Sequence, residues 1–135
     1  MQKHKTLEKL SYKNFRRLTG IKRNTFKVMT GILKTANKAR EKRGGPKRIL
    51  CEEDCLLLCL EYLREYRTYF HLGFDYGISE SQAQRTQKWV EKELISNKQF
   101  HLPNRKELLE NKGDFEVIVV DATESPIERP KKNKK

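Results

Sequence analysis

The segment TYFHLGFDYGISESQAQRTQKWVEKEL, residues 68–94, sets the architecture that we expect for this chain. Gly77 lies between two segments with helical periodicity, and glycine readily adopts the positive φ of a short turn between helices. Ser79 followed by Gln82 predicts a capping box at the start of a new helix. Gly73 is small at the position where the second helix crosses the first. Residues 68–94 therefore predict a helix-turn-helix.

The second predicted helix has two faces with different roles. Its inner face and the end of the preceding helix supply side chains that we expect to be buried: Leu72, Tyr76, Ile78, Ala83 and Val90. The outer positions give the candidate DNA-binding residues Ser79, Glu80, Ser81, Gln84, Arg85 and Lys88. These side chains can donate and accept hydrogen bonds on base edges or phosphates, as a recognition helix does in the major groove. The alternative is a surface hairpin whose polar face is only solvated.

The positive charge of the chain is concentrated at its ends. The 135 residues have a formal net charge of +12. Residues 1–48 contain 16 Lys or Arg against 2 Asp or Glu, a net of +14, whereas residues 49–130 have a net of −6 and residues 131–135 add four lysines. A basic block of this kind attracts nucleic acid phosphates. A membrane surface fits less well, because no large hydrophobic face accompanies the cations.

Composition excludes several other classes of protein. The mean hydropathy is −0.89 with 36% charged residues, and no apolar run approaches the roughly 18 residues of a membrane helix. The first residues lack the apolar core of a signal peptide, so we expect a cytoplasmic protein. Cys51, Cys55 and Cys59 recur at i, i+4 and i+8 on one predicted helix, and we interpret them as small buried apolar residues. His71 is interpreted as a packed or surface histidine.

Other helices should surround the motif. A short helix at 13–19, ended by Gly20, should turn Phe15 and Leu18 inward, and a longer helix should be capped by Asn24 or Thr25. Residues 42–47, KRGGPK, have the composition of a loop or hinge. The next helix, from Glu52 to about Tyr66, should be central and buried. We expect the small core to include Leu63, Phe70 and Phe74 as well.

The last part of the chain changes character. Val117 to Val120 form a continuous β-branched run that predicts a buried strand. Asp121 follows at once, and a carboxylate in this position suits a first Mg²⁺ ligand, although Asp also favours turns for purely local reasons. The predicted fold class is mainly α. It has an N-terminal helical hairpin and hinge (1–48), a three-helix helix-turn-helix unit (49–100), then a linker and the first β-strand of a truncated RNase H-like domain (101–135).

The segment VIVVDATESPIERP, residues 117–130, resembles the surroundings of the first catalytic acid in bacterial insertion-sequence DDE transposases that begin with a helix-turn-helix. NFRRLTGIKRNTF, LCLEYLREYRTY, YGISESQAQR and HLPNRKELLE also resemble that family, in the family's order. The resemblance implies an enzyme that uses Mg²⁺ held by three acids, with Asp121 as the first metal ligand and catalytic acid. Ala122 stands where the family usually has Gly.

The resemblance also implies partners and an incomplete site. Double-stranded DNA at transposon ends would be the ligand, with a homodimer or the full-length transposase as protein partner and no small-molecule substrate. Because the second and third acids are missing, Mg²⁺ would serve only the complete enzyme, and this chain should be inactive alone. A degraded copy, a short product or the first of two frames joined by ribosomal slippage would each explain this. The alternative function is a stand-alone helix-turn-helix transcriptional regulator.

Overall fold

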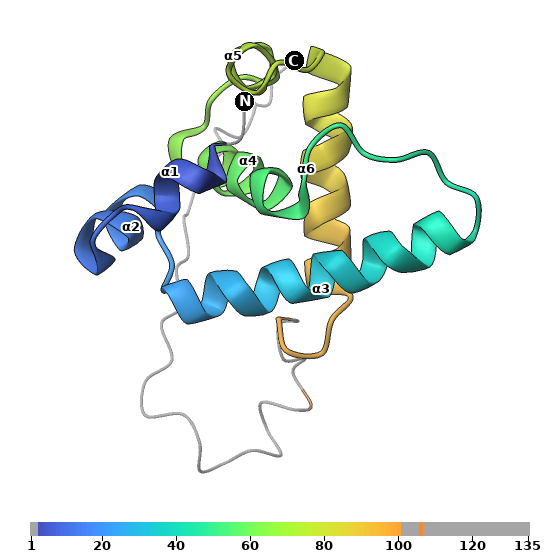
Figure 1. Cartoon of the computed structure of the whole chain (residues 1–135), viewed down its shortest axis with the longest axis horizontal. Coiled ribbons are helices and arrows are strands. Elements are labelled where there is room, and N and C mark those ends of the chain that lie inside the picture. The colour runs from blue at the N-terminus through green and yellow to red at the C-terminus, as the bar shows by residue number, and fades with distance from the viewer. Residues whose placement is uncertain (1–2, 101–105, 107–135) are drawn as a thin grey trace, which may run out of the picture. The chain divides into compact units, whose positions relative to one another are not determined.

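The computed structural model describes residues 3–100 and 106 (Figure 1). The described residues contain six helices and no strand: α1 His4–Glu8, α2 Tyr12–Thr19, α3 Arg23–Lys42, α4 Glu52–Glu65, α5 Tyr69–Tyr76 and α6 Glu80–Ile95. The mainly helical prediction is confirmed for this part. None of these helices is both long and apolar enough to cross a membrane. The predicted strand and Asp121 lie outside the described residues.

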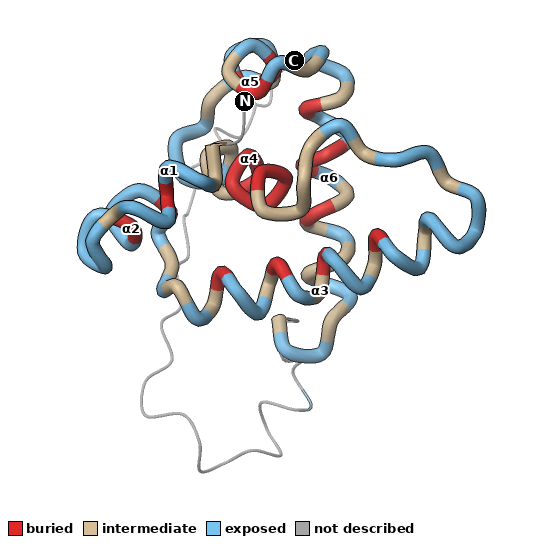
Figure 2. Tube along the Cα trace, viewed as in Figure 1, coloured by how far each residue is buried: buried red, intermediate tan, exposed pale blue. Residues whose placement is uncertain are grey.

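Helix α4 forms the centre of the helical unit. Every residue from Asp54 to Cys59 is buried, because the other helices contact this segment on several sides (Figures 1 and 2). Cys55 and Cys59 are buried within it, as predicted, but the prediction is wrong for Cys51, which is only half-buried at the N-cap of α4. Figure 2 shows further buried positions on α3 and α6, which also contact each other. The predicted central helix is therefore confirmed, with α3, α5 and α6 packed around it.

The N-terminal helices differ in detail from the predictions. Helix α1 was not predicted at all, because five residues are too few to show helical periodicity. Gly20 ends α2 with a φ of +81°, as expected, and Phe15 packs edge-to-face on Phe26 of α3 with ring centroids 5.6 Å apart. The prediction for Leu18 is wrong, since this side chain is 45% exposed. The N-cap of α3 is Lys22, without a side-chain bond, rather than Asn24 or Thr25.

Three acidic residues at the start of α4 each contact another helix. Glu52 accepts a hydrogen bond from Asn37 Nδ2 at 2.9 Å, and Glu53 pairs with Lys34 Nζ at 2.6 Å. Both partners belong to α3. Asp54 accepts a hydrogen bond at 2.8 Å from the backbone N–H of His4, the first residue of α1. The positive end of the helix dipole stabilises negative charge at this position. The same three residues also hold α3 and α1 against α4.

Three side chains that the sequence placed in the core, at the end of α4 and on α5, are exposed in the structure. Leu63, Phe70 and Phe74 are 49%, 65% and 85% exposed, so the expectation that they would be buried is wrong. Helix α5 instead buries Leu72, Gly73 and Tyr76. Its eight residues cannot turn all of their aromatic side chains toward α4 and α6, and the remainder face outward.

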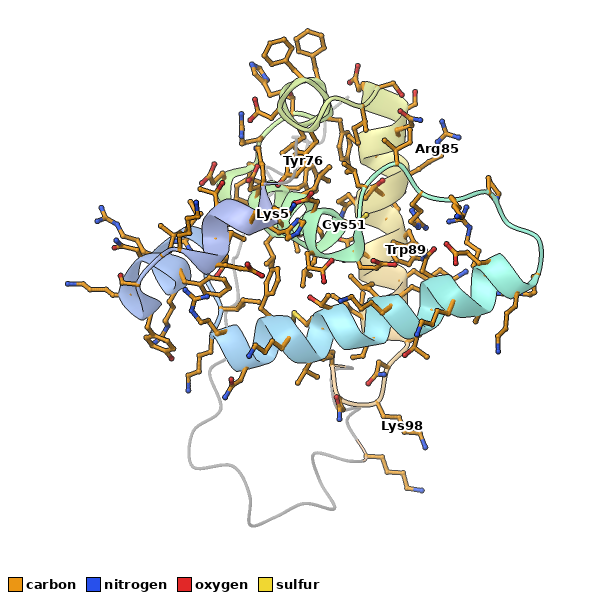
Figure 3. All side chains as sticks on the ribbon, in the orientation of Figure 1. Lys5, Cys51, Tyr76, Arg85, Trp89 and Lys98 are labelled. Atoms are coloured by element: carbon orange, nitrogen blue, oxygen red, sulfur yellow. The ribbon has the colours of Figure 1, made fainter. Side chains whose placement is uncertain are left out.

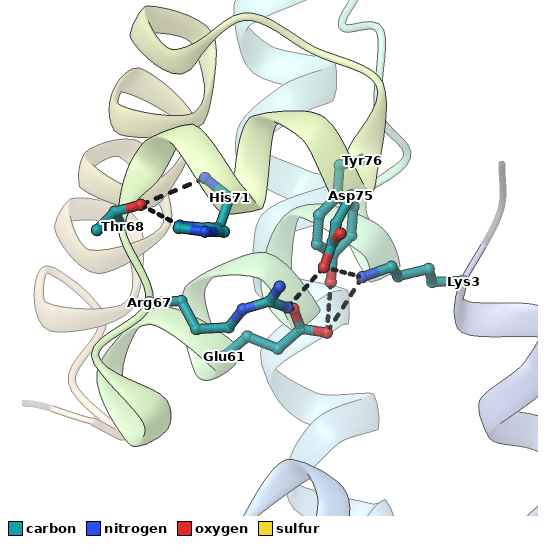
Figure 4. Close-up of polar contacts among 7 residues, drawn as sticks. All are labelled: Lys3, Glu61, Arg67, Thr68, His71, Asp75 and Tyr76. Atoms are coloured by element: carbon teal, nitrogen blue, oxygen red, sulfur yellow. Dashed lines mark hydrogen bonds and ion pairs between the residues drawn. The ribbon is translucent and has the colours of Figure 1, made fainter.

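A network of charges joins the start of the chain to α4 and α5 (Figure 4). Asp75 lies 2.6 Å from Arg67 Nη1 and 3.5 Å from Lys3 Nζ. Glu61 accepts a hydrogen bond from the Tyr76 hydroxyl at 3.1 Å and also pairs with Lys3 and Arg67. The network therefore connects segments that are more than 50 residues apart in the sequence.

Candidate nucleic-acid interface

The turn between α5 and α6 has the local chemistry that the sequence predicted. Gly77 ends α5 with a φ of +65°. The Ser79 side chain accepts a hydrogen bond from the Gln82 backbone N–H, and the Gln82 side chain accepts one from the Ser79 backbone N–H, at 3.3 and 3.0 Å. The capping box is therefore confirmed. It fixes the start of α6 at Glu80, three positions after Gly77.

The two helices approach each other most closely at Gly73. A Cβ atom added to this residue would lie 2.7 Å from the carbonyl oxygen of Ile78 and 3.3 Å from the backbone nitrogen of Glu80. The turn and the start of α6 thus lie directly on the backbone of α5. This contact sets the angle at which α6 leaves the turn.

The inner face of α6 is fixed by packing on α3, α4 and α5. Ala83 and Val90 are fully buried, and Gln87 is 2% exposed. The amide oxygen of Gln87 accepts a hydrogen bond from the Tyr69 hydroxyl at 3.2 Å. A buried polar side chain with such a partner specifies the rotation of the helix.

The residues predicted to contact DNA lie on the outer face of α6 and at its N-cap, Ser79. Ser79, Glu80, Ser81, Gln84, Arg85 and Lys88 are all exposed. The Arg85 side chain is visible at the edge of α6 in Figure 3, and its Nε donates a hydrogen bond to the Ser81 carbonyl oxygen at 3.1 Å. This bond uses Nε and leaves the two terminal nitrogens of the guanidinium to point outward.

The loop between α3 and α4 lies beside the first turns of α6. Together they line a surface groove that includes Arg40, Lys47, Arg48, Gln82 and Arg85. Residues 42–47 have the composition of a loop or hinge, and nothing in the sequence indicates that this loop lies beside α6. The groove brings four cationic side chains from three segments to one side of the candidate recognition helix.

Two contacts hold this loop in place. The Arg48 guanidinium lies 3.6 Å from the centroid of the Trp89 ring, which is on α6 (Trp89 is labelled in Figure 3), and Arg40 Nη2 donates a hydrogen bond to the Pro46 carbonyl oxygen at 2.5 Å. Burial lowers the pKa of Arg48 below its ordinary value. Arg40 Nη1 and Arg48 Nε are buried and make no hydrogen bond within the described part of the chain.

A tight glycine turn, a capped second helix and an exposed polar ridge define a helix-turn-helix, a fold that places its second helix in the major groove of DNA. Residues 48–97 match the family described as helix-turn-helix of DDE superfamily endonuclease. These residues belong to that family, and the chain is similar to the N-terminal part of an insertion-sequence transposase.

A curated relative extends the similarity beyond the helix-turn-helix. The chain is 45% identical over 129 residues to the probable transposase for insertion sequence element IS702 of Microchaete diplosiphon. The alignment includes 95% of this chain and 46% of the relative, so the chain spans about half the length of the protein that it matches. No solved structure shows a significant match.

Proposed function

We propose that this chain binds the ends of its insertion element through α6. The ridge formed by Ser81, Gln84, Arg85 and Lys88 would read base edges in the major groove, with Ser79 and Glu80 at its start. A serine, a glutamine and an arginine offer the donors and acceptors that base edges present there. The observation that supports this proposal best is the exposure of the N-cap Ser79 and of the five other predicted residues on α6, a helix whose opposite face is buried.

The basic loop would contact the phosphates next to that groove. Lys47 is exposed, and Arg40 and Arg48 line the same groove beside α6. Cationic side chains beside a recognition helix neutralise phosphates and fix its register, while the base contacts supply specificity. We therefore assign positioning to the loop and sequence discrimination to α6.

Similarity along 95% of the chain, well past residue 97, favours a transposase over a stand-alone regulator with the same motif. We further propose that Asp121, which lies outside the described residues, is the first of three acids that hold Mg²⁺ in a complete enzyme. There the metal would activate the attacking oxygen and stabilise the leaving oxygen. The present chain would supply end recognition.

Replacement of Arg85 tests base readout directly. Affinity is measured by fluorescence anisotropy on a duplex with the element's terminal sequence and on a shuffled duplex of equal length and composition. Arg85→Ala should reduce discrimination between the two by about 1–3 kcal/mol, because a bidentate base contact is lost. Arg17, an exposed arginine on α2, gives the matched control, and Arg17→Ala should leave the ratio unchanged.

Equal losses on both duplexes would show that Arg85 contacts only the phosphate backbone. Absence of binding to either duplex at low salt would refute the proposed function as a whole.

A further inference from the structure

Three metal-binding side chains converge where α1 meets α4, away from the groove beside α6. Cys51 is the N-cap of α4 and Asp54 is its third residue, so their side chains lie on the same side of the first turn. His4 begins α1. Its Nδ1 lies 3.3 Å from Cys51 Sγ and 3.2 Å from Asp54 Oδ1, and the three ligand atoms all lie within 4.8 Å of one another.

We propose that His4, Cys51 and Asp54 bind a Zn²⁺ ion that joins α1 to α4. Thiolate sulfur, imidazole nitrogen and carboxylate oxygen are the three ligand types that zinc takes in proteins. In a tetrahedral site with metal–ligand bonds of 2.0–2.3 Å, neighbouring ligand atoms are about 3.3–3.6 Å apart. The distances from His4 Nδ1 to Cys51 Sγ and Asp54 Oδ1 are close to this spacing, and small rotations of these side chains would reach it.

The surroundings of Asp54 support a cation at this place. Its carboxylate is buried, with the residue only 1% exposed, and in the described part of the chain His4 is the ion-pair partner it has. The neighbouring acids are already used, since Glu52 binds Asn37 and Glu53 binds Lys34. A buried carboxylate is stabilised by a neighbouring positive charge, and a bound Zn²⁺ ion would supply one here.

The site would have three protein ligands and room for a fourth from solvent. His4 and Glu53 line a surface groove between α1, α3 and α4, so the histidine ring is accessible from one side. Zinc binds cysteine as the thiolate, so binding of the ion would displace the proton of the Cys51 thiol.

Cobalt provides the most direct test, because Co²⁺ bound to a thiolate absorbs strongly in the near ultraviolet and a tetrahedral Co²⁺ site absorbs in the visible. The untagged full-length chain is titrated with CoCl₂ in the absence of DNA and then with ZnCl₂. We expect one Co²⁺ per chain, both absorption bands, and displacement by one equivalent of Zn²⁺. We also expect zinc to raise the melting temperature of the chain.

Two variants assign the ligands. Cys51→Ser keeps Cys55 and Cys59, so loss of the near-ultraviolet band would place the thiolate at residue 51. His4→Ala should weaken zinc binding by about tenfold or more, since even changes outside the ligand shell cost this much. His71→Ala removes an exposed histidine on α5 and should retain both bands and the zinc affinity.

The Co²⁺ spectrum of the wild-type chain tests the proposed site even if a variant fails to fold. Octahedral Co²⁺ without a thiolate band, or a thiolate band that survives in folded Cys51→Ser, would refute the site. Because no DNA is present, either result is independent of end recognition by α6.

Discussion

At the scale of single residues, Gly73 has the strictest requirement in the helix-turn-helix. Its side-chain position is occupied by the backbone of Ile78 and Glu80, which cannot rotate away as a flexible side chain would. Gly31, on α3, is the opposite case, because nothing lies within 4 Å of a Cβ built there. Two helical glycines in the same chain thus have different steric surroundings.

Gly73→Ala should therefore destabilise the chain by about 1–3 kcal/mol, because the added methyl group overlaps backbone atoms. Gly31→Ala should stabilise it by up to about 1 kcal/mol, because alanine favours the helix and has space there. Urea denaturation followed by far-ultraviolet circular dichroism measures both. Equal effects of the two substitutions would contradict the assignment of close packing to Gly73.

Features of the helix-turn-helix that depend on neighbouring residues could be predicted from the sequence. The cap at Ser79, the positive φ of Gly77 and the small residue at 73 each act within a few positions, and all three are confirmed. His4 lies 47 residues from Cys51, and no periodicity links them. Their meeting depends on the packing of α1, a helix too short to predict.

At the scale of elements, α6 and the preceding basic loop form one surface. The outer residues of α6 were predictable, since they follow from helical periodicity after a recognised cap. The position of the loop between α3 and α4 could not be predicted, because it depends on the contact between Arg48 and Trp89, which are distant in sequence. The exposed aromatic residues of α5 show the same limit, since periodicity does not reveal how much of a short helix its neighbours can cover.

Lys47 provides a test of the loop that is separate from the Arg85 experiment. If it neutralises one phosphate, Lys47→Ala should reduce the slope of log K against log salt concentration by about 1, on terminal and shuffled duplexes alike. Lys98, an exposed lysine beyond the end of α6, is the matched control and should leave the slope unchanged. A change in discrimination without a change in slope would assign Lys47 to base readout instead.

At the scale of the whole molecule, charge networks connect segments that are distant in sequence. The hydrogen bond from Arg67 lowers the pKa of Asp75, with a further contribution from Lys3. A carboxylate whose pKa is lower in the folded state stabilises that state above its unfolded pKa, and this stabilisation is lost as the pH falls through the folded value.

We therefore expect the chain to lose stability as the pH falls below about 5, with Asp75 responsible for part of the loss. Asp75→Asn should be less stable than the wild type at pH 7, and the difference between them should shrink on acidification. Urea midpoints at several pH values measure this. Glu8→Gln, at an exposed position on α1, should leave the pH dependence as it is. A constant difference for Asp75→Asn would argue against a role for its charge.

The stacking of Arg48 on Trp89 has a practical consequence. Trp89 is the single tryptophan of the chain, so its fluorescence comes from one place, the junction between the basic loop and α6. Any ligand that draws the guanidinium off the indole ring alters the emission. Loop rearrangement can therefore be followed in real time by stopped flow, without attaching a dye.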